Sequence, residues 1–417
     1  MLLEQSLPYG PGMTRRKTTL GRRLAFLSVP LLCLSTATAQ LRSPEFMAQA
    51  RQGFDQIYNL DYREAEATFS ALQARYPEHP APPLYLATVV WLRELFERNE
   101  LDLDHFIAPA YFTKATDRKM SPADRKKFFD YLAACQKICE STLEKDPKNL
   151  DARYFLGSVF GLQGGFAITI DRSYSDAFSH GKKAYKLHHQ LVHEKPDYFD
   201  GYMSVGLYEY VVDNIPWYIK WIAMLVGYRG SQERGFEYLN RTAQKGFYAS
   251  DDARVLQMVL FVREKRYAEA LQNAGTLHKK YPRNYILHLN RAQILEMMGK
   301  REQAVAEYTA VVRQAEAGTL NYSRINLGSL RMTLARKFMM MRQFGPAFEQ
   351  YDAVVRQAGA SNAARVLSQL GAAQALDAQG KRAEAVKRYE AVLQLPDAED
   401  AHAKARRCLS RPYAGAE

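Results

Sequence analysis

Hydrophobic and small residues recur at helical spacing along the chain, most clearly over residues 285–312. Apolar positions three and four residues apart alternate there with polar ones, which predicts two amphipathic helices. The small residue Ala292 lies in the middle of the first helix, and Gly299 interrupts the pattern between the two. The second helix places Ala304 and Tyr308 on one face, because residues four apart are neighbours on a helix. The segment is therefore predicted to form a helix–turn–helix unit.

The same spacing recurs elsewhere. Each regular unit has a compact residue in its first helix (helix A) and another twelve residues later in its second helix (helix B). The pairs are Gly53 with Ala65, Met258 with Ala270, Ala292 with Ala304, Ala335 with Ala347, and Ala373 with Ala385. Pro77 and Pro282 each follow the helix-B residue by twelve positions, where proline would end the helix. Two fixed spacings predict a repeat architecture.

This pattern resembles the tetratricopeptide repeat, a 34-residue helix–turn–helix unit in which small residues lie where helices A and B cross. The resemblance implies an all-α, right-handed α-solenoid of about eight repeats, with a concave surface lined by A helices. We expect the repeats near residues 46–79, 80–149, 150–198, 199–247, 251–284, 285–318, 328–361 and 366–396. They form a divergent half, 46–247, and a regular half, 248–396, followed by a capping helix and tail at 397–417.

Repeats two to four depart from the regular spacing. The compact residues are 48 positions apart from Ala87 to Cys135, 27 apart from Gly157 to Ala184, and 29 apart from Gly206 to Gly235. All of the extra length falls between helix A and helix B, and the A–B turns of a solenoid project from one edge. The sequence therefore predicts enlarged A–B loops that gather on one edge and form the best candidate for a binding face.

The insertion in repeat four contains an aromatic run at 215–227. Its Trp217, Tyr218 and Trp221 are candidate partner-binding residues, because aromatic side chains anchor protein interfaces. Trp and Tyr also favour a membrane interface, where Lys220 would keep its charge in water, although the run is too short to span a bilayer. A third alternative is that the run packs over the neighbouring insertions as a local core.

Three polar residues of the regular repeats are candidate groove residues. Arg254, Asn290 and Arg291 lie on predicted A helices, which line the concave face in the family that the chain resembles. The sequence contains no phosphate loop, G-x-S-x-G, H-E-x-x-H or dinucleotide fingerprint. We therefore expect a non-catalytic protein that needs no cofactor.

The histidines and cysteines are the candidates for metal and redox chemistry. His189 and His193 share a helix face, but no carboxylate or cysteine completes a metal set, and His188 at the aromatic packing position is expected to face inward. Cys135 and Cys139 are four apart on one helix, a poor geometry for a disulfide, so burial as small residues is favoured over redox or metal chemistry. No metal site is expected.

The N-terminus has the pattern of a secretion signal. A basic segment, 15–23, precedes an apolar stretch, 24–34, and Ala37-Thr38-Ala39 fits a signal-peptidase site. We predict a signal peptide at 1–39, cleaved between Ala39 and Gln40, and export to the periplasm or cell envelope. The alternative is an uncleaved N-terminal anchor.

Composition narrows the function. The 417 residues are 47% hydrophobic and 24% charged, which excludes a disordered chain and a multi-span membrane protein. The net charge of +12 is spread along the chain without an arginine-rich tract, so no nucleic-acid partner is expected. We interpret the chain as an exported scaffold that binds proteins or peptides. One alternative is a peripheral envelope protein that contacts a membrane through 215–227, and the least favoured is an enzyme with an unrecognised site in the insertions.

Overall fold

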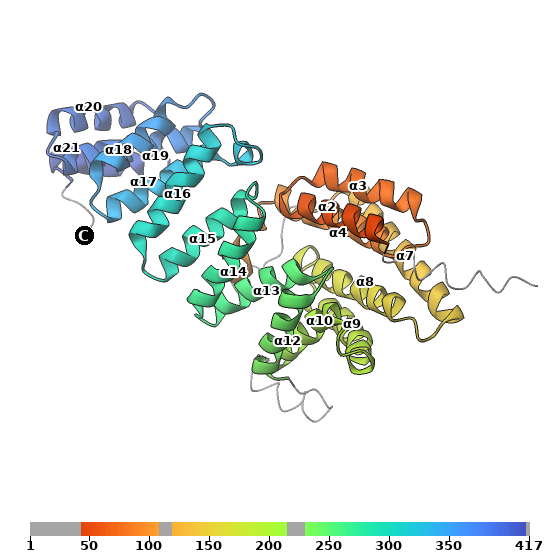
Figure 1. The fold of residues 1–417 in the computed structure, drawn as a ribbon. Coiled ribbons are helices and arrows are strands. Elements are labelled where there is room, and N and C mark those ends of the chain that lie inside the picture. The colour runs from red at the N-terminus through yellow and green to blue at the C-terminus, as the bar shows by residue number, and fades with distance from the viewer. Residues whose placement is uncertain (1–42, 108–118, 215–229, 414–417) are drawn as a thin grey trace, which may run out of the picture. The chain divides into compact units, whose positions relative to one another are not determined.

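Helices stacked in sequence order make up the fold. The computed structural model describes residues 43–107, 119–214 and 230–413, and within these ranges the regular structure is helical, without a strand (Figure 1). Contacts divide the chain into two compact units, Met1–Pro44 and Glu45–Glu417, and the repeats lie in the second. Most helices of that unit pack mainly against the preceding and the following helix. The predicted fold class, an α-solenoid of helix pairs, is confirmed.

Eight helix pairs follow one another along the described ranges. Repeats one to four pair α2 (Pro44–Tyr58) with α3 (Tyr62–Arg75), α4 (Ala81–Glu97) with α7 (Pro122–Lys145), α8 (Leu150–Thr169) with α9 (Tyr174–Glu194), and α10 (Tyr202–Asp213) with α12 (Gln232–Lys245). Repeats five to eight pair α13 (Ser250–Arg263) with α14 (Tyr267–Lys280), α15 (Tyr285–Met297) with α16 (Arg301–Glu316), α17 (Leu327–Met340) with α18 (Phe344–Arg356), and α19 (Asn362–Ala378) with α20 (Arg382–Leu393). The shorter elements are α5 (Leu103–Ile107), η1 (Phe199–Gly201), η2 (Tyr322–Arg324) and the terminal α21 (Ala401–Ser410).

The compact residues of the repeat pattern lie inside the helix crossings. The buried set comprises Gly53, Ala65, Ala87, Cys135, Gly157, Ala184, Gly206, Gly235, Met258, Ala270, Ala292, Ala304, Ala335, Ala347, Ala373 and Ala385. A Cβ on Gly53 would meet the ring of Phe69 at 2.4 Å, and one on Gly157 would meet the ring of His188 at 2.3 Å. The aromatic residue of helix B therefore lies directly on the glycine of helix A.

A left-handed residue ends the A helix in repeats one, two and five to eight. The residues are Leu60, Asn99, Lys265, Gly299, Arg342 and Gly380, with φ between 56° and 77°. In each case the next N–H reaches a carbonyl five residues back, as from Arg266 to Phe261 and from Lys300 to Leu295. This pairing satisfies carbonyls that the end of a helix would otherwise leave free.

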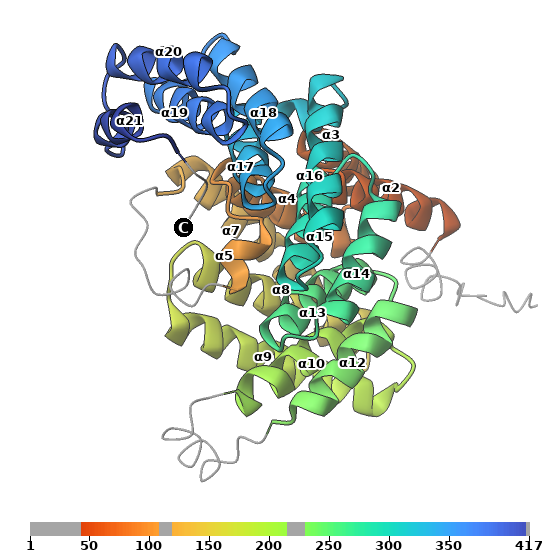
Figure 2. The same ribbon diagram turned by 90° about the vertical axis from the view of Figure 1, so that its left-hand side faces the viewer.

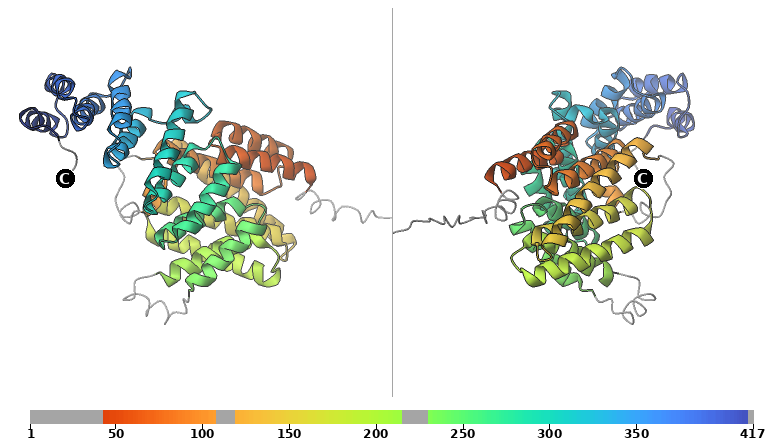
Figure 3. Two further views of the ribbon diagram at one scale, coloured as in Figure 1. Left: turned by 60° about the vertical axis from the view of Figure 1, so that its left-hand side comes forward. Right: turned by 90° about the vertical axis from the view of Figure 1, so that its right-hand side faces the viewer.

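The enlargements of repeats two and three take different forms. In repeat three the added residues lengthen both helices, so α8 has 20 residues and α9 has 21. In repeat two α4 ends with the same turn as a regular A helix, since the Glu100 N–H bonds the Leu95 carbonyl, and α5 then precedes an α7 of 24 residues. The right-hand view of Figure 3 shows α7 to α10, coloured orange to yellow-green, packed side by side.

The first repeat also contacts a distant part of the array. Its A–B turn bonds the turn between α14 and α15 and the segment before α17, where Asn321 donates to the Asn59 carbonyl and to Asp61. Arg283 adds its backbone N–H to the Asn59 side chain at 3.1 Å and an ion pair to Asp61. We call Asn59, Asp61, Arg283 and Asn321 the first-repeat junction. It ties repeat one to the linkers on either side of repeat six.

Within the described ranges no helix is both long and apolar enough to cross a membrane.

Candidate functional site

Two surfaces stand out, and the first lies at the A–B turns of repeats two to four. The N-terminal ends of α7 and α9 meet the C-terminal end of α8 there, because consecutive helices of the array run in opposite directions. The C-terminal half of α10 lies beside the middle of α9, where Tyr208 stacks on Tyr185. Arg125 near the start of α7 binds Asp171 after α8 through two N–H···O contacts of 2.6 and 3.0 Å. Its guanidinium also lies 5.3 Å from the ring of Phe129. We call this surface the turn edge.

Large apolar side chains are exposed along the turn edge. Among the described residues the exposed ones are Phe129 (38%), Tyr174 (54%), Phe178 (38%) and Val211 (43%) at the edge, with Leu320 (60%) and Met340 (64%) elsewhere. Tyr174 and Phe178 are one helical turn apart at the start of α9, so they lie on one face. Grouped exposed apolar residues are a mark of an interaction surface, whereas scattered single ones are not.

Exposed lysines continue the same stripe of α9. Lys182 and Lys186 follow Phe178 at four-residue intervals, so aromatic and basic side chains occupy successive turns of one face. Lys183 lies beside them with its ammonium 5.2 Å from the ring of Phe160 on α8. The stripe therefore combines an apolar end with a cationic one.

The second surface is formed by the A helices of repeats five and six, α13 and α15, and α5 lies on it (Figure 2). The backbone N–H of Leu103 in α5 donates to Asn290 Oδ1 at 3.3 Å, and Gln293 Nε2 donates to Asp104 Oδ2 at 2.9 Å. Asn290 is buried. One predicted groove residue therefore holds the backbone of the chain's own insertion.

Apolar contacts complete that docking. Leu103 is 1% exposed and belongs to a buried cluster with Met258, Phe261 and Ile294, against which Ile107 also packs. Since Leu103 and Ile107 are four residues apart, both lie on the same side of α5. We call the surface formed by α13 and α15 under α5 the A-helix face.

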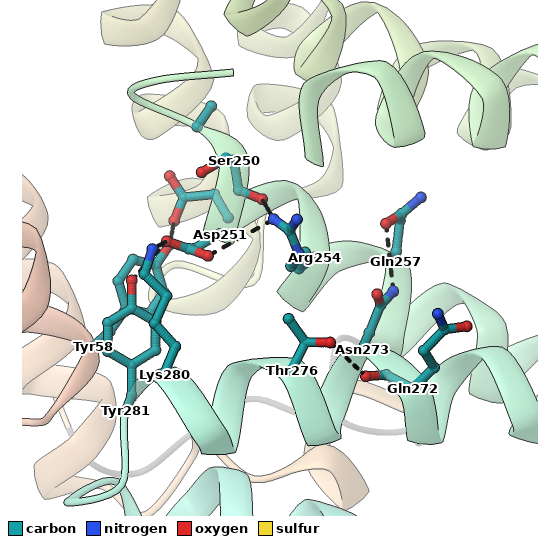
Figure 4. A network of polar contacts seen from close by, with 12 residues as sticks. Tyr58, Ser250, Asp251, Arg254, Gln257, Gln272, Asn273, Thr276, Lys280 and Tyr281 are labelled. Atoms are coloured by element: carbon teal, nitrogen blue, oxygen red, sulfur yellow. Dashed lines mark hydrogen bonds and ion pairs between the residues drawn. The ribbon is translucent and has the colours of Figure 1, made fainter. Parts of the chain in front are cut away.

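Arg254 belongs to a polar network shown in Figure 4. Its guanidinium approaches the Ser250 carbonyl at 3.4 Å and Asp251 Oδ1 at 3.9 Å. The other oxygen of Asp251 accepts from Lys280 Nζ at 2.5 Å and from the Tyr281 hydroxyl at 2.6 Å. Burial raises the pKa of Tyr281, and its bond to Asp251 raises it further, so the phenol stays protonated and donates. Arg254 thus has intramolecular partners on its own helix.

Arg291 faces helix B of its own repeat. It binds Glu307 Oε1 at 2.8 Å, and the other oxygen of Glu307 lies 2.9 Å from His288 Nε2. The hydrogen bond from His288 lowers the pKa of Glu307, so the carboxylate is charged and pairs with the guanidinium. The structure brings Asn290 to the A-helix face and places Arg291 in the α15–α16 interface.

Some of the residues predicted from the sequence lie outside the described ranges, and the structure shows the positions of the others. Trp217, Tyr218 and Trp221 lie outside them, as does the predicted signal peptide. His188 faces inward as expected, with Nε2 2.8 Å from the Tyr154 carbonyl, while Cys135 and Cys139 are buried free thiols. Within the part of the chain that the structure describes, no three His, Cys, Asp or Glu side chains are grouped to hold a metal ion.

Sequence reasoning missed α5. Residues 101–107 follow a complete A helix and contain no repeat pattern, so nothing local assigns them to a face of repeats five and six. The four-residue spacing of Leu103 and Ile107 was the available signal, since it gives a short helix one apolar side.

Comparisons with known proteins are limited to the fold. No family model and no curated protein matches the chain. Among solved structures, a tetratricopeptide repeat protein from Parabacteroides merdae is 14% identical over 75% of this chain and 92% of that one, with a TM-score of 0.29. Yeast Tom70 is 13% identical over 90% and 83%, with a TM-score of 0.32, and human IFIT1 with m7Gppp-AAAA is 13% identical over 90% and 90%, with a TM-score of 0.34. Such low TM-scores say nothing about function.

Proposed function

We propose that the chain is a non-catalytic scaffold that binds a protein partner through the turn edge. The observation that carries this proposal is the exposure of Phe129 on α7, of Tyr174 and Phe178 on α9, and of Val211 near the end of α10, three helices of the turn edge. Aromatic and aliphatic side chains on rigid helix ends are suitable anchors, because little conformational entropy is lost when they are covered. The partner would present an apolar patch with acidic groups opposite Lys182 and Lys186.

The test compares two double variants of the tagged chain in affinity purification from its native cells. Tyr174→Ser/Val211→Ser removes two apolar side chains of the turn edge, and Leu320→Ser/Met340→Ser removes two exposed ones elsewhere. We expect recovery of a specific partner to fall about tenfold or more for the edge variant only, since interface anchors contribute more than ~1 kcal/mol each. Equal recovery with both variants, each melting like the wild type, would exclude the turn edge.

A membrane surface is the second candidate for the same edge. The observation that favours it is the stripe of Tyr174, Phe178, Lys182 and Lys186, because aromatic tips enter a headgroup layer while lysines bind its phosphates. Flotation with phosphatidylserine-containing liposomes would detect it. Lys182→Ala/Lys186→Ala and Trp217→Ala/Trp221→Ala should each reduce flotation, and binding equal to that with phosphatidylcholine alone would reject the membrane.

Export is part of the proposal. The basic and apolar segments at 15–34 and the Ala37-Thr38-Ala39 site support a cleaved signal. Fractionation of cells with N-terminal sequencing of the mature chain should find Gln40 first and the protein in the envelope or periplasm. A cytoplasmic chain that retains residues 15–34 would overturn export.

A further inference from the structure

The contact of α5 with the A-helix face has the form of peptide recognition. Asn290 holds a backbone N–H of α5, which every peptide except one with proline at that position can supply. Leu103 is buried in an apolar cluster to which two different repeats contribute, since Met258 comes from α13 and Ile294 from α15. Peptide-binding sites combine affinity with specificity in this way. One side chain binds the peptide backbone, and a neighbouring apolar site selects one residue.

A side-chain hydrogen bond adds a second level of selection. Asp104 follows Leu103 directly and accepts from Gln293. Partial burial is the main cause that raises the pKa of Asp104, Asp102 and Glu296 raise it as well, and His105 and Lys337 on α17 lower it. Gln293 Oε1 is buried and has no hydrogen-bond partner within the described residues, so the face retains an acceptor that α5 does not use. The site therefore holds a carboxyl group next to an apolar anchor through the hydrogen bond from Gln293, and it has capacity for one more N–H.

The array does not need α5 at this position to pair its helices. The A helix of repeat two closes with its own turn at Asn99, and α4 packs directly on α7. With only five residues, α5 contributes little to the core beyond Leu103 and Ile107. Its removal from the face would expose a formed site rather than dismantle a repeat.

We propose that the A-helix face of repeats five and six is a peptide-binding site that α5 occupies as an intramolecular ligand. The partner that displaces α5 is a short acidic segment with two aliphatic anchors four residues apart and an Asp or Glu directly after the first. This site is independent of the turn edge, and either can fail without the other. While α5 is bound, only a partner that outcompetes a tethered segment gains access, because tethering gives α5 a high effective concentration.

The test uses the full chain and a fluorescein-labelled peptide with the sequence of residues 100–107, ELDLDHFI. Leu103→Asp/Ile107→Asp in the chain removes both anchors of α5 and should free the face. Anisotropy should then show peptide binding to this variant at least about tenfold tighter than to the wild type. Adding Asn290→Ala/Gln293→Ala should abolish binding again, and a peptide with both anchors replaced by Asp should not bind.

A matched variant excludes a general effect of added charge. Leu320→Asp/Met340→Asp places the same substitutions at exposed apolar positions elsewhere and should leave peptide binding as weak as in the wild type. A cooperatively melting Leu103→Asp/Ile107→Asp chain that fails to bind the peptide would overturn the proposal. If that variant does not fold, Leu103→Ala, which truncates the anchor without adding charge, takes its place with the same two outcomes.

Discussion

The side-chain amide of Asn321 donates a hydrogen bond of 2.5 Å to the backbone carbonyl of Asn59, 262 residues earlier in the chain. It also donates to Asp61 Oδ1 at 2.7 Å, and Asn321 itself has a φ of 69°. One residue thus satisfies two acceptors of the first repeat from a left-handed conformation that asparagine tolerates better than most residues.

Substitution of Asn321 should therefore show two separable losses. Asn321→Gly keeps the positive φ and loses the hydrogen bonds, which should lower the free energy of unfolding by about 2 kcal/mol. Asn321→Ala should cost about 1 kcal/mol more, because alanine resists this backbone conformation. Urea unfolding measures both. If Asn321→Gly matches the wild type, the first-repeat junction contributes nothing to stability.

The left-handed C-caps allow a stabilising change. Lys265 has a φ of 59° at the position that Gly299 and Gly380 occupy in repeats six and eight. Lys265→Gly should raise the free energy of unfolding by about 0.5–1 kcal/mol, as relief of the left-handed strain exceeds the added entropy of the unfolded chain. Gly299→Ala should have the opposite sign in the same urea titration. A fall in stability with Lys265→Gly would contradict the assignment of strain to this turn.

The crossing of α10 and α12 should tolerate no side chain at its centre. A Cβ on Gly235 would lie 2.9 Å from the Gly206 carbonyl oxygen and 3.0 Å from the Tyr210 backbone nitrogen. Because both atoms are backbone, Gly235→Ala should cost about 2–3 kcal/mol. Gly275→Ala on α14, where a Cβ meets nothing within 4 Å, should instead gain about 0.5–1 kcal/mol from helix propensity. Thermal melting of the pair checks the contrast, and equal effects would refute it.

His188 should make the chain sensitive to acid. Its Nε2 lies 2.8 Å from the Tyr154 carbonyl and its Nδ1 bonds the Ser204 hydroxyl, an arrangement that a neutral ring completes by donating to the first and accepting from the second. Burial lowers the pKa of His188 from 6.5 to about 4. Above pH 6.5 the ring is neutral in both the folded and the unfolded chain, so stability is full. As the pH falls from 6.5 toward 4, the unfolded chain binds a proton that the folded chain does not, and the free energy of unfolding therefore falls.

His188→Phe removes that titration and keeps an aromatic ring over Gly157, as Phe69 lies over Gly53. Relative to the wild type, the variant should gain about 2 kcal/mol in unfolding free energy between pH 7 and pH 5. Urea midpoints at both pH values measure the difference. The exposed His193→Gln variant is the control, and an unchanged gap between His188→Phe and wild type at the two pH values would disprove the role of burial.

The sequence predicted the contacts that form between the two helices of one repeat. The position of His188, four residues after Ala184 as Phe69 is four after Ala65, predicted that its ring faces inward, and the structure places that ring on Gly157. The sequence did not predict that α8 continues through Gly164 and Gly165, which helix propensity disfavours. Tertiary packing explains the helix there, since a Cβ on Gly164 would lie 3.3 Å from the Ala177 carbonyl on α9 and one on Gly165 would lie 3.1 Å from the Trp91 ring.

The repeat pattern could not predict contacts between residues far apart in the chain. The candidate edge followed from insertion lengths, but the docking of Leu103 on Asn290 joins residues 187 positions apart with no shared motif. The segment before α17 departs from the repeat and is not one of the predicted units, yet it supplies Asn321 and Arg324 to the first repeat. Such contacts depend on how each repeat is rotated relative to the one before it. These small rotations add up along the array, and the repeat pattern does not encode them.

The first-repeat junction has a consequence for how this protein can evolve. An open solenoid gains or loses whole repeats by duplication and deletion, because each unit touches only its neighbours. Here Asp61 must meet Arg283 and Asn321, so an added or lost repeat between them would rotate and separate both sides of the junction. Repeats seven and eight follow those partners in the chain. Changes in repeat number among related proteins should therefore accumulate from α17 onward and spare the six repeats that the junction encloses.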